Sequence, residues 1–166
     1  MKQIVKITTV SALILTGACS HLQAEKTFSE LEAINSVSAT GSSFTRNLTL
    51  EYRALANSEY KTEGDYPDSL HYARKGLAAA RGHAVMPEPM DDWDLSAQDL
   101  VQILKGRSRL VDAYRRGARS LLPGLSARAQ ARFDCWVEES EESAGSADAQ
   151  SCRSEFKDTL TQLEGQ

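Results

Sequence analysis

Hydrophobic residues recur every three or four positions over most of the chain after Phe44, which is the period of an amphipathic α-helix. Capping and breaking residues divide this pattern into five predicted helices. We expect them over about 44–59, 67–81, 96–120, 126–142 and from 147 to near the C-terminus. No run of strand length alternates with period two. The sequence therefore predicts an all-α domain, 44–164, whose helices pack as antiparallel hairpins in a bundle or in the manner of tetratricopeptide repeats.

The last two predicted helices flank a turn rich in serine and glycine, within the stretch FDCWVEESEESAGSADAQSCRSEF at 133–156. Cys135 and Cys152 are placed symmetrically about that turn, so they face each other if the two helices fold back as a hairpin. We therefore expect a disulfide that locks the C-terminal hairpin. In the chain-entropy model a loop of this size stabilises a domain by roughly 3 kcal/mol.

The helical stripes also predict a core. Inward positions of the last two helices include Phe133, Trp136 and Phe156, and those of the third predicted helix include Leu104 and Tyr114. Small residues oppose the large ones across the hairpin, which lets the two helices pack closely.

The segment HAVMPEPMDDWDL at 83–95 interrupts the helices, because its two prolines exclude regular structure. It is too apolar for a free linker, and we expect it to lie along the helices with Trp93 partly buried. Its aspartates lack the alternating spacing and the glycine of an EF-hand loop. The chain also has no His-Glu-x-x-His or Cys-x-x-Cys motif, so we expect no metal and no cofactor.

The first residues have the pattern of an export signal. Lys2 and Lys6 precede an apolar stretch, 7–15, that is too short to span a bilayer. Thr16-Gly17-Ala18-Cys19 follows and resembles a bacterial lipobox. We expect a lipoprotein signal peptide over 1–18 and lipidation of Cys19 by acyl chains such as palmitate.

Lipidation of Cys19 would also explain why an exported protein has three cysteines, since the other two can then pair in an oxidising periplasm. The alternative is a plain secretory signal cut after Ala24, which would give a soluble periplasmic protein. For 19–43 we expect a polar tether, although Phe28 to Val37 could form a short helix.

The net charge of −4 becomes about −6 without the two lysines of the leader. An acidic chain argues against nucleic acid as a partner and against a polybasic attraction to the membrane surface. Attachment to the membrane would therefore come from the N-terminal lipid.

Catalytic motifs are missing from the sequence. There is no Gly-x-Ser-x-Gly elbow, P-loop or dinucleotide fingerprint. Glu138, Glu139, Glu141 and Glu142 could do acid/base chemistry on a glycan, but we expect a solvated acidic face. The five arginines of the third predicted helix could form a binding strip, but we expect a solvated face paired with this acidic run. We therefore expect no catalytic residue.

Several stretches resemble the N-terminal region of OmpA-family outer-membrane lipoproteins of alphaproteobacteria: ALANSEY, DYPDSLHYARKGLAAARGHAVMPEP, ARAQARFDCWVEESEE and CRSEF. The resemblance covers roughly 44–163 and implies an outer-membrane location, a helical architecture and the disulfide. In that family a C-terminal peptidoglycan-binding domain follows. This sequence stops at Gln166, so we expect no such domain, and the wall-binding residues of the family have no positions here.

The favoured hypothesis is a lipid-anchored, non-enzymatic helical module on the periplasmic face of the outer membrane. It would take part in the organisation of the cell envelope by holding an envelope protein as its partner. A second hypothesis is binding of peptidoglycan or another polysaccharide by the helical domain. A third is an enzyme acting on envelope glycans.

Overall fold

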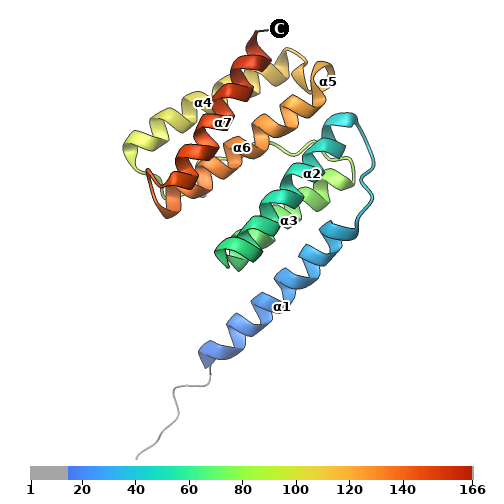
Figure 1. The fold of residues 1–166 in the computed structure, drawn as a ribbon, viewed down its shortest axis with the longest axis vertical. Coiled ribbons are helices and arrows are strands. Elements are labelled where there is room, and N and C mark those ends of the chain that lie inside the picture. The colour runs from blue at the N-terminus through green and yellow to red at the C-terminus, as the bar shows by residue number, and fades with distance from the viewer. Residues whose placement is uncertain (1–14, 166) are drawn as a thin grey trace, which may run out of the picture.

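The computed structural model describes the backbone of residues 15–165 and the side chains of residues 26–165. This part of the chain is helical throughout apart from its connections, which confirms the all-α prediction (Figure 1). It contains seven α-helices and one short π-helix, in the order α1 (Leu15–Ser36), α2 (Ser43–Ser58), η1 (Glu59–Glu63), α3 (Tyr66–Ala80), α4 (Ala97–Arg115), α5 (Ala118–Leu121), α6 (Pro123–Glu142) and α7 (Ala147–Glu164).

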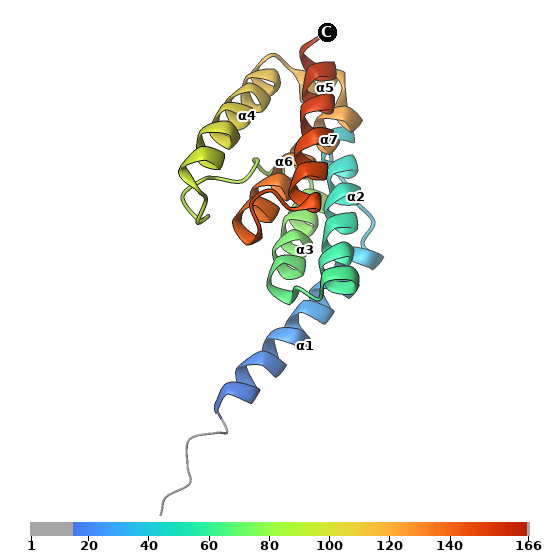
Figure 2. The ribbon, with the colours of Figure 1, turned by 60° about the vertical axis from the view of Figure 1, so that its left-hand side comes forward.

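Two antiparallel pairs, α2 with α3 and α6 with α7, make up most of the domain (Figure 1). The central element is α6, which contacts α2 on one side and both α4 and α7 on the other (Figure 2). Because it has neighbours on several sides, most of its residues are buried, including polar ones. The position of α6 therefore decides which of its side chains need partners inside the protein.

The segment expected to be a tether differs from that prediction. It is helical as far as Ser36, and Leu31 and Ile34 on α1 are buried. A Cβ atom added to Gly76 of α3 would lie 2.1 Å from Cδ1 of Ile34, so a larger residue there would force the Ile34 side chain to move where α1 packs on α3. The N-terminal part of α1 projects beyond the other helices (Figure 1).

The predicted signal peptide, 1–18, lies largely outside the described residues. The side chains of Cys19 and Ala24, at the predicted lipidation and alternative cleavage sites, lie outside them as well. Over residues 15–165, no helix has both the length and the apolar character needed to cross a membrane.

Side-chain caps determine where most of these helices begin. The capping residue just before the helix accepts, through a side-chain oxygen, a hydrogen bond from the backbone N–H three residues later. The caps of this kind are Ser42 for α2, Asp65 for α3, Ser96 for α4 and Ser146 for α7. The sequence prediction was wrong for α6, which begins at Pro123 rather than after Ser126. Proline fits the first helical position because its missing N–H would have no partner there.

The third predicted helix is divided into α4 and α5. Gly117 adopts a φ of 93°, a conformation that favours glycine, and the chain turns there. Leu104 is 47% exposed, so its assignment to the core was wrong. Its neighbour Ile103 faces inward, and one residue further along a helix points about 100° away.

The C-terminal hairpin forms as expected, with a disulfide between Cys135 and Cys152. The core prediction also holds for Phe133, Trp136 and Phe156, which are buried. The ring of Phe156 lies 5.2 Å from that of Phe133 and 5.8 Å from that of Trp136, measured between centroids. Tyr114 is only partly buried and packs against the edge of the core.

Candidate functional site

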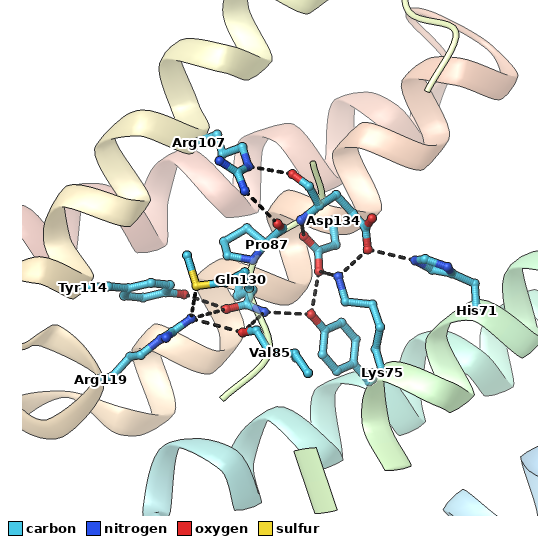
Figure 3. Close-up of polar contacts among 12 residues, drawn as sticks. His71, Lys75, Val85, Pro87, Arg107, Tyr114, Arg119, Gln130 and Asp134 are labelled. Atoms are coloured by element: carbon cyan, nitrogen blue, oxygen red, sulfur yellow. Dashed lines mark hydrogen bonds and ion pairs between the residues drawn. The ribbon is translucent and has the colours of Figure 1, made fainter. Parts of the chain in front are cut away.

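A buried polar network joins α2, α3 and α6 to the proline-containing segment 83–95 (Figure 3). Its centre is Asp134 of α6, which is fully buried. This carboxylate accepts hydrogen bonds from the Tyr52 hydroxyl at 2.6 Å, from Lys75 Nζ at 2.7 Å and from the backbone N–H of Glu88 at 2.9 Å.

Lys75 lies between two carboxylates, because it also forms an ion pair with the side chain of Glu88. Glu88 is hydrogen-bonded in addition to His71 Nε2 at 2.8 Å. Burial opposes ionisation of Glu88, but its hydrogen bond with His71 and the charge of Lys75 lower its pKa to about 2. Complete burial raises the pKa of Asp134, against the opposing effect of Lys75.

The rest of the network holds the backbone of the same segment. Arg107 Nε donates to the Glu88 carbonyl at 2.7 Å, and Arg119 and Gln130 each donate to the Val85 carbonyl at 3.1 Å. The expectation that the arginines of the third predicted helix form a solvated face was therefore wrong for Arg107 and Arg119. These contacts satisfy backbone carbonyls that have no helix or sheet to pair with.

The contacts of the network hold the segment 83–95 in place. Asp134 has hydrogen bonds on both oxygens, and only 14% of the Lys75 side chain is exposed. The segment is thereby fixed against α3, α4 and α6, with Trp93 partly buried as expected.

A groove, which we call the α4–α7 groove, lies between α4 and α7. Two adjoining cavities of about 280 and 230 Å³ form it, and both are bordered by Gln102 and Trp136. Phe156 also lines it beneath Gly106, where an added Cβ atom would come within 2.8 Å of the Phe156 ring. The charged side chains that line it are mostly positive: Lys105, Arg109, Arg153 and Lys157, with Asp99 as the one carboxylate among the lining residues of the two cavities.

A third feature is an acidic cluster where η1, the start of α3 and the end of α6 meet. Here the prediction of a solvated acidic face was wrong for Glu138 and Glu139, which are 1% and 6% exposed. Burial, and then nearby carboxylates, raise the pKa of Glu138 to about 10, that of Glu59 to about 8 and that of Glu139 to about 7. Glu141 and Glu142 are exposed, as expected.

A repeat of polar residues on α6 links the buried polar network to the acidic cluster. Gln130, Asp134 and Glu138 are four residues apart, so they share one face of α6, and all three are buried. The sequence analysis did not predict that Lys75, Glu88 and Asp134 form a buried network. The apolar stripe of a helix does not show whether its polar residues are buried as well.

Comparisons of the chain with protein-family models, with curated proteins and with solved structures find no match. The resemblance to OmpA-family lipoproteins therefore stays a prediction.

The network predicts that Lys75→Met strongly destabilises the domain. The substitution leaves Asp134 and Glu88 buried together without a cation, and removal of one partner from a buried ion pair lowers the free energy of unfolding by about 3–5 kcal/mol. Urea unfolding measures the effect. The exposed Lys26, which has no ion pair among residues 26–165, provides the control: Lys26→Met should change stability by less than about 0.5 kcal/mol. Equal effects of the two substitutions would contradict the role given to Lys75.

The acidic cluster predicts that stability falls as the pH rises. The pKa values of Glu59, Glu138 and Glu139 are raised in the folded protein, so above the usual glutamate pKa of about 4.3 the folded state binds more protons than the unfolded state. In buffer without divalent cations, the free energy of unfolding should decrease from about pH 5.5 to about pH 8.5. Glu138→Gln should reduce this slope, whereas the exposed Asp158→Asn should keep it. A stability that increases over this range would contradict the prediction.

Proposed function

We propose that this protein is a lipid-anchored, non-enzymatic module on the periplasmic face of the outer membrane, and that it holds a segment of another envelope protein in the α4–α7 groove. The anchor is proposed from the sequence Thr16-Gly17-Ala18-Cys19 behind an apolar stretch. The observation that carries the binding role is the groove, since it combines an aromatic base with charged edges.

The chemistry of the groove favours a helical segment with an apolar stripe and acidic flanks. Trp136 and Phe156 line its base, where they are 3% and 1% exposed, and aromatic residues are common anchors in protein interfaces. Recognition of an amphipathic helix in a groove uses this combination. A helix laid between α4 and α7 would bring its acidic side chains to the edges.

Two of the cations along the groove are available to such a partner. Arg109 pairs with Glu164, and Arg153 donates to Gln102. Lys105 and Lys157, by contrast, form no ion pair within residues 26–165. Partial burial and then the charge of Arg153 lower the pKa of Lys157, so a carboxylate brought beside it would be favourable.

The groove also supports binding rather than catalysis. The polar groups that line the larger of its two cavities include the amides of Gln98, Gln102 and Gln150, the carboxylate of Asp99 and the guanidinium of Arg153. The hydroxyl of Ser140 is already bonded to the backbone carbonyl of Trp136 at 2.6 Å. Such groups orient a partner and offer no activated nucleophile beside a base.

The test is charge reversal in the groove, by Lys105→Glu combined with Lys157→Glu. Tagged protein would be expressed in a Gram-negative bacterium, cross-linked, and recovered from the outer-membrane fraction. We expect wild type to recover a specific envelope protein and the double variant to recover at least tenfold less, since rejection of like charges is strong at a complementary interface.

The matched control reverses two exposed cations outside the groove, with Lys26→Glu and Arg81→Glu, and should recover the partner at the wild-type level. Equal recovery by the two double variants would contradict the proposal. Sedimentation with purified peptidoglycan, lost in the groove variant alone, would instead support the polysaccharide-binding alternative.

A further inference from the structure

The acidic cluster brings together carboxylates from three separate segments. In one group, single oxygens of Glu63, Glu139 and Glu142 all lie within 4.8 Å of one another. In a second group the same holds for Asp65, Asp68 and Glu142. Because Glu142 belongs to both, the two groups form one continuous acidic surface at the ends of η1 and α6 and the start of α3.

The carboxylates of the cluster form no ion pair within the part of the chain whose side chains the structure describes. Arg132 lines the neighbouring cavity of about 160 Å³ but makes no ion pair there, and Asp148 adds a further carboxylate to the lining. Like charges at such distances repel one another.

A second observation is independent of the surface carboxylates. Glu59 is 2% exposed, its Oε2 has no hydrogen-bond partner, and its side chain lines the same cavity as Glu63 and Glu139. Behind it, both carboxylate oxygens of Glu138 are buried without a partner. Buried polar groups in proteins are otherwise nearly always satisfied, so each exception calls for a ligand or another explanation.

The backbone at this place is unusual as well. Glu59 and Glu63 are the first and last residues of η1, a π-helix, and Gly64 follows with a φ of 75°. Single π-helical turns are rare and occur frequently at functional sites. Here the wide turn and the glycine place two glutamates beside the end of α6.

We propose that this cluster is a binding site for a divalent cation of the calcium class, held by Glu63, Glu139 and Glu142 with Glu59 behind them. The available donors are oxygens, those of the carboxylates and of the Ser58 and Ser151 hydroxyls that line the same cavity. The two sulfur atoms that border the cavity, of Cys135 and Cys152, are joined in the disulfide and cannot act as thiolate ligands. Oxygen donors alone select a hard cation over zinc or copper.

Calcium fits this set better than magnesium. It accepts six to eight oxygens in flexible geometry, whereas magnesium demands a near-ideal octahedron. The cluster offers many oxygens on side chains from several elements, with no octahedral frame. A bound cation would tie η1 and the start of α3 to the end of α6, and it would balance the charge of the exposed Glu63 and Glu142. This proposal departs from the absence of a metal expected from sequence motifs, because its residues share no short motif.

The experiment is titration of the purified protein, disulfide intact, with calcium chloride at neutral pH, followed by calorimetry and by thermal unfolding. We expect saturable binding and an upward shift in Tm of roughly 5–10 °C when calcium is about 100 times Kd. Sodium chloride at matched ionic strength should not reproduce the shift, since screening alone has no saturable site.

Two variants sharpen the result. Glu142 is exposed and belongs to both groups, so Glu142→Gln should fold, should raise Tm in a chelating buffer by relieving repulsion, and should weaken calcium binding by about tenfold or more. The exposed Asp158→Asn should bind calcium as wild type does. The proposal is overturned if calcium gives no saturable heat and no shift beyond that of matched sodium chloride, or if Glu142→Gln responds as Asp158→Asn does.

Discussion

Lys75, held between the buried carboxylates of Asp134 and Glu88, is the interaction on which the rest of the arrangement depends. It joins α3, α6 and the irregular segment 83–95 at one point. A carboxylate buried without a cation would be costly, so the three groups have to stay together. Once Glu88 is fixed, arginines from α4 and α5 can bind the carbonyls of the same segment, and α4 is placed for the groove that it forms with α7.

The buried polar residues of α6 have different roles toward the two ends of the helix. At Gln130 and Asp134 the polar atoms are bonded to neighbouring helices and to the segment 83–95. One turn later, Glu138 has no partner on either oxygen and lies with other carboxylates around it. The first part of the stripe thus stabilises the fold. In the second part, burial without hydrogen-bond partners raises the pKa of Glu138, and strongly raised pKa values are typical of places that bind a ligand.

Local signals in the sequence predicted much of the fold. The period of apolar residues indicated α2, α3, α6 and α7, and the symmetry of Cys135 and Cys152 about their turn predicted the disulfide. Other features of the structure depend on tertiary contacts, which these local signals do not predict. Glu59 and Glu63 lie at the two ends of η1 and line one cavity with Glu139, and no sequence pattern predicted this π-helix. The ion pair between Lys75 and Asp134 joins residues 59 positions apart, and the sequence does not specify which charges meet across such a distance.

Native-state hydrogen exchange at the backbone amide of Glu88 tests the central claim most directly. That N–H lies outside any helix, and only its bond to Asp134 at 2.9 Å would protect it. If the buried ion network fixes the segment to the helices, the amide should exchange only through global unfolding, with a free energy within about 1 kcal/mol of that for the interior of α6. Exchange through a low-energy local opening, with α6 still protected, would contradict this role of the network.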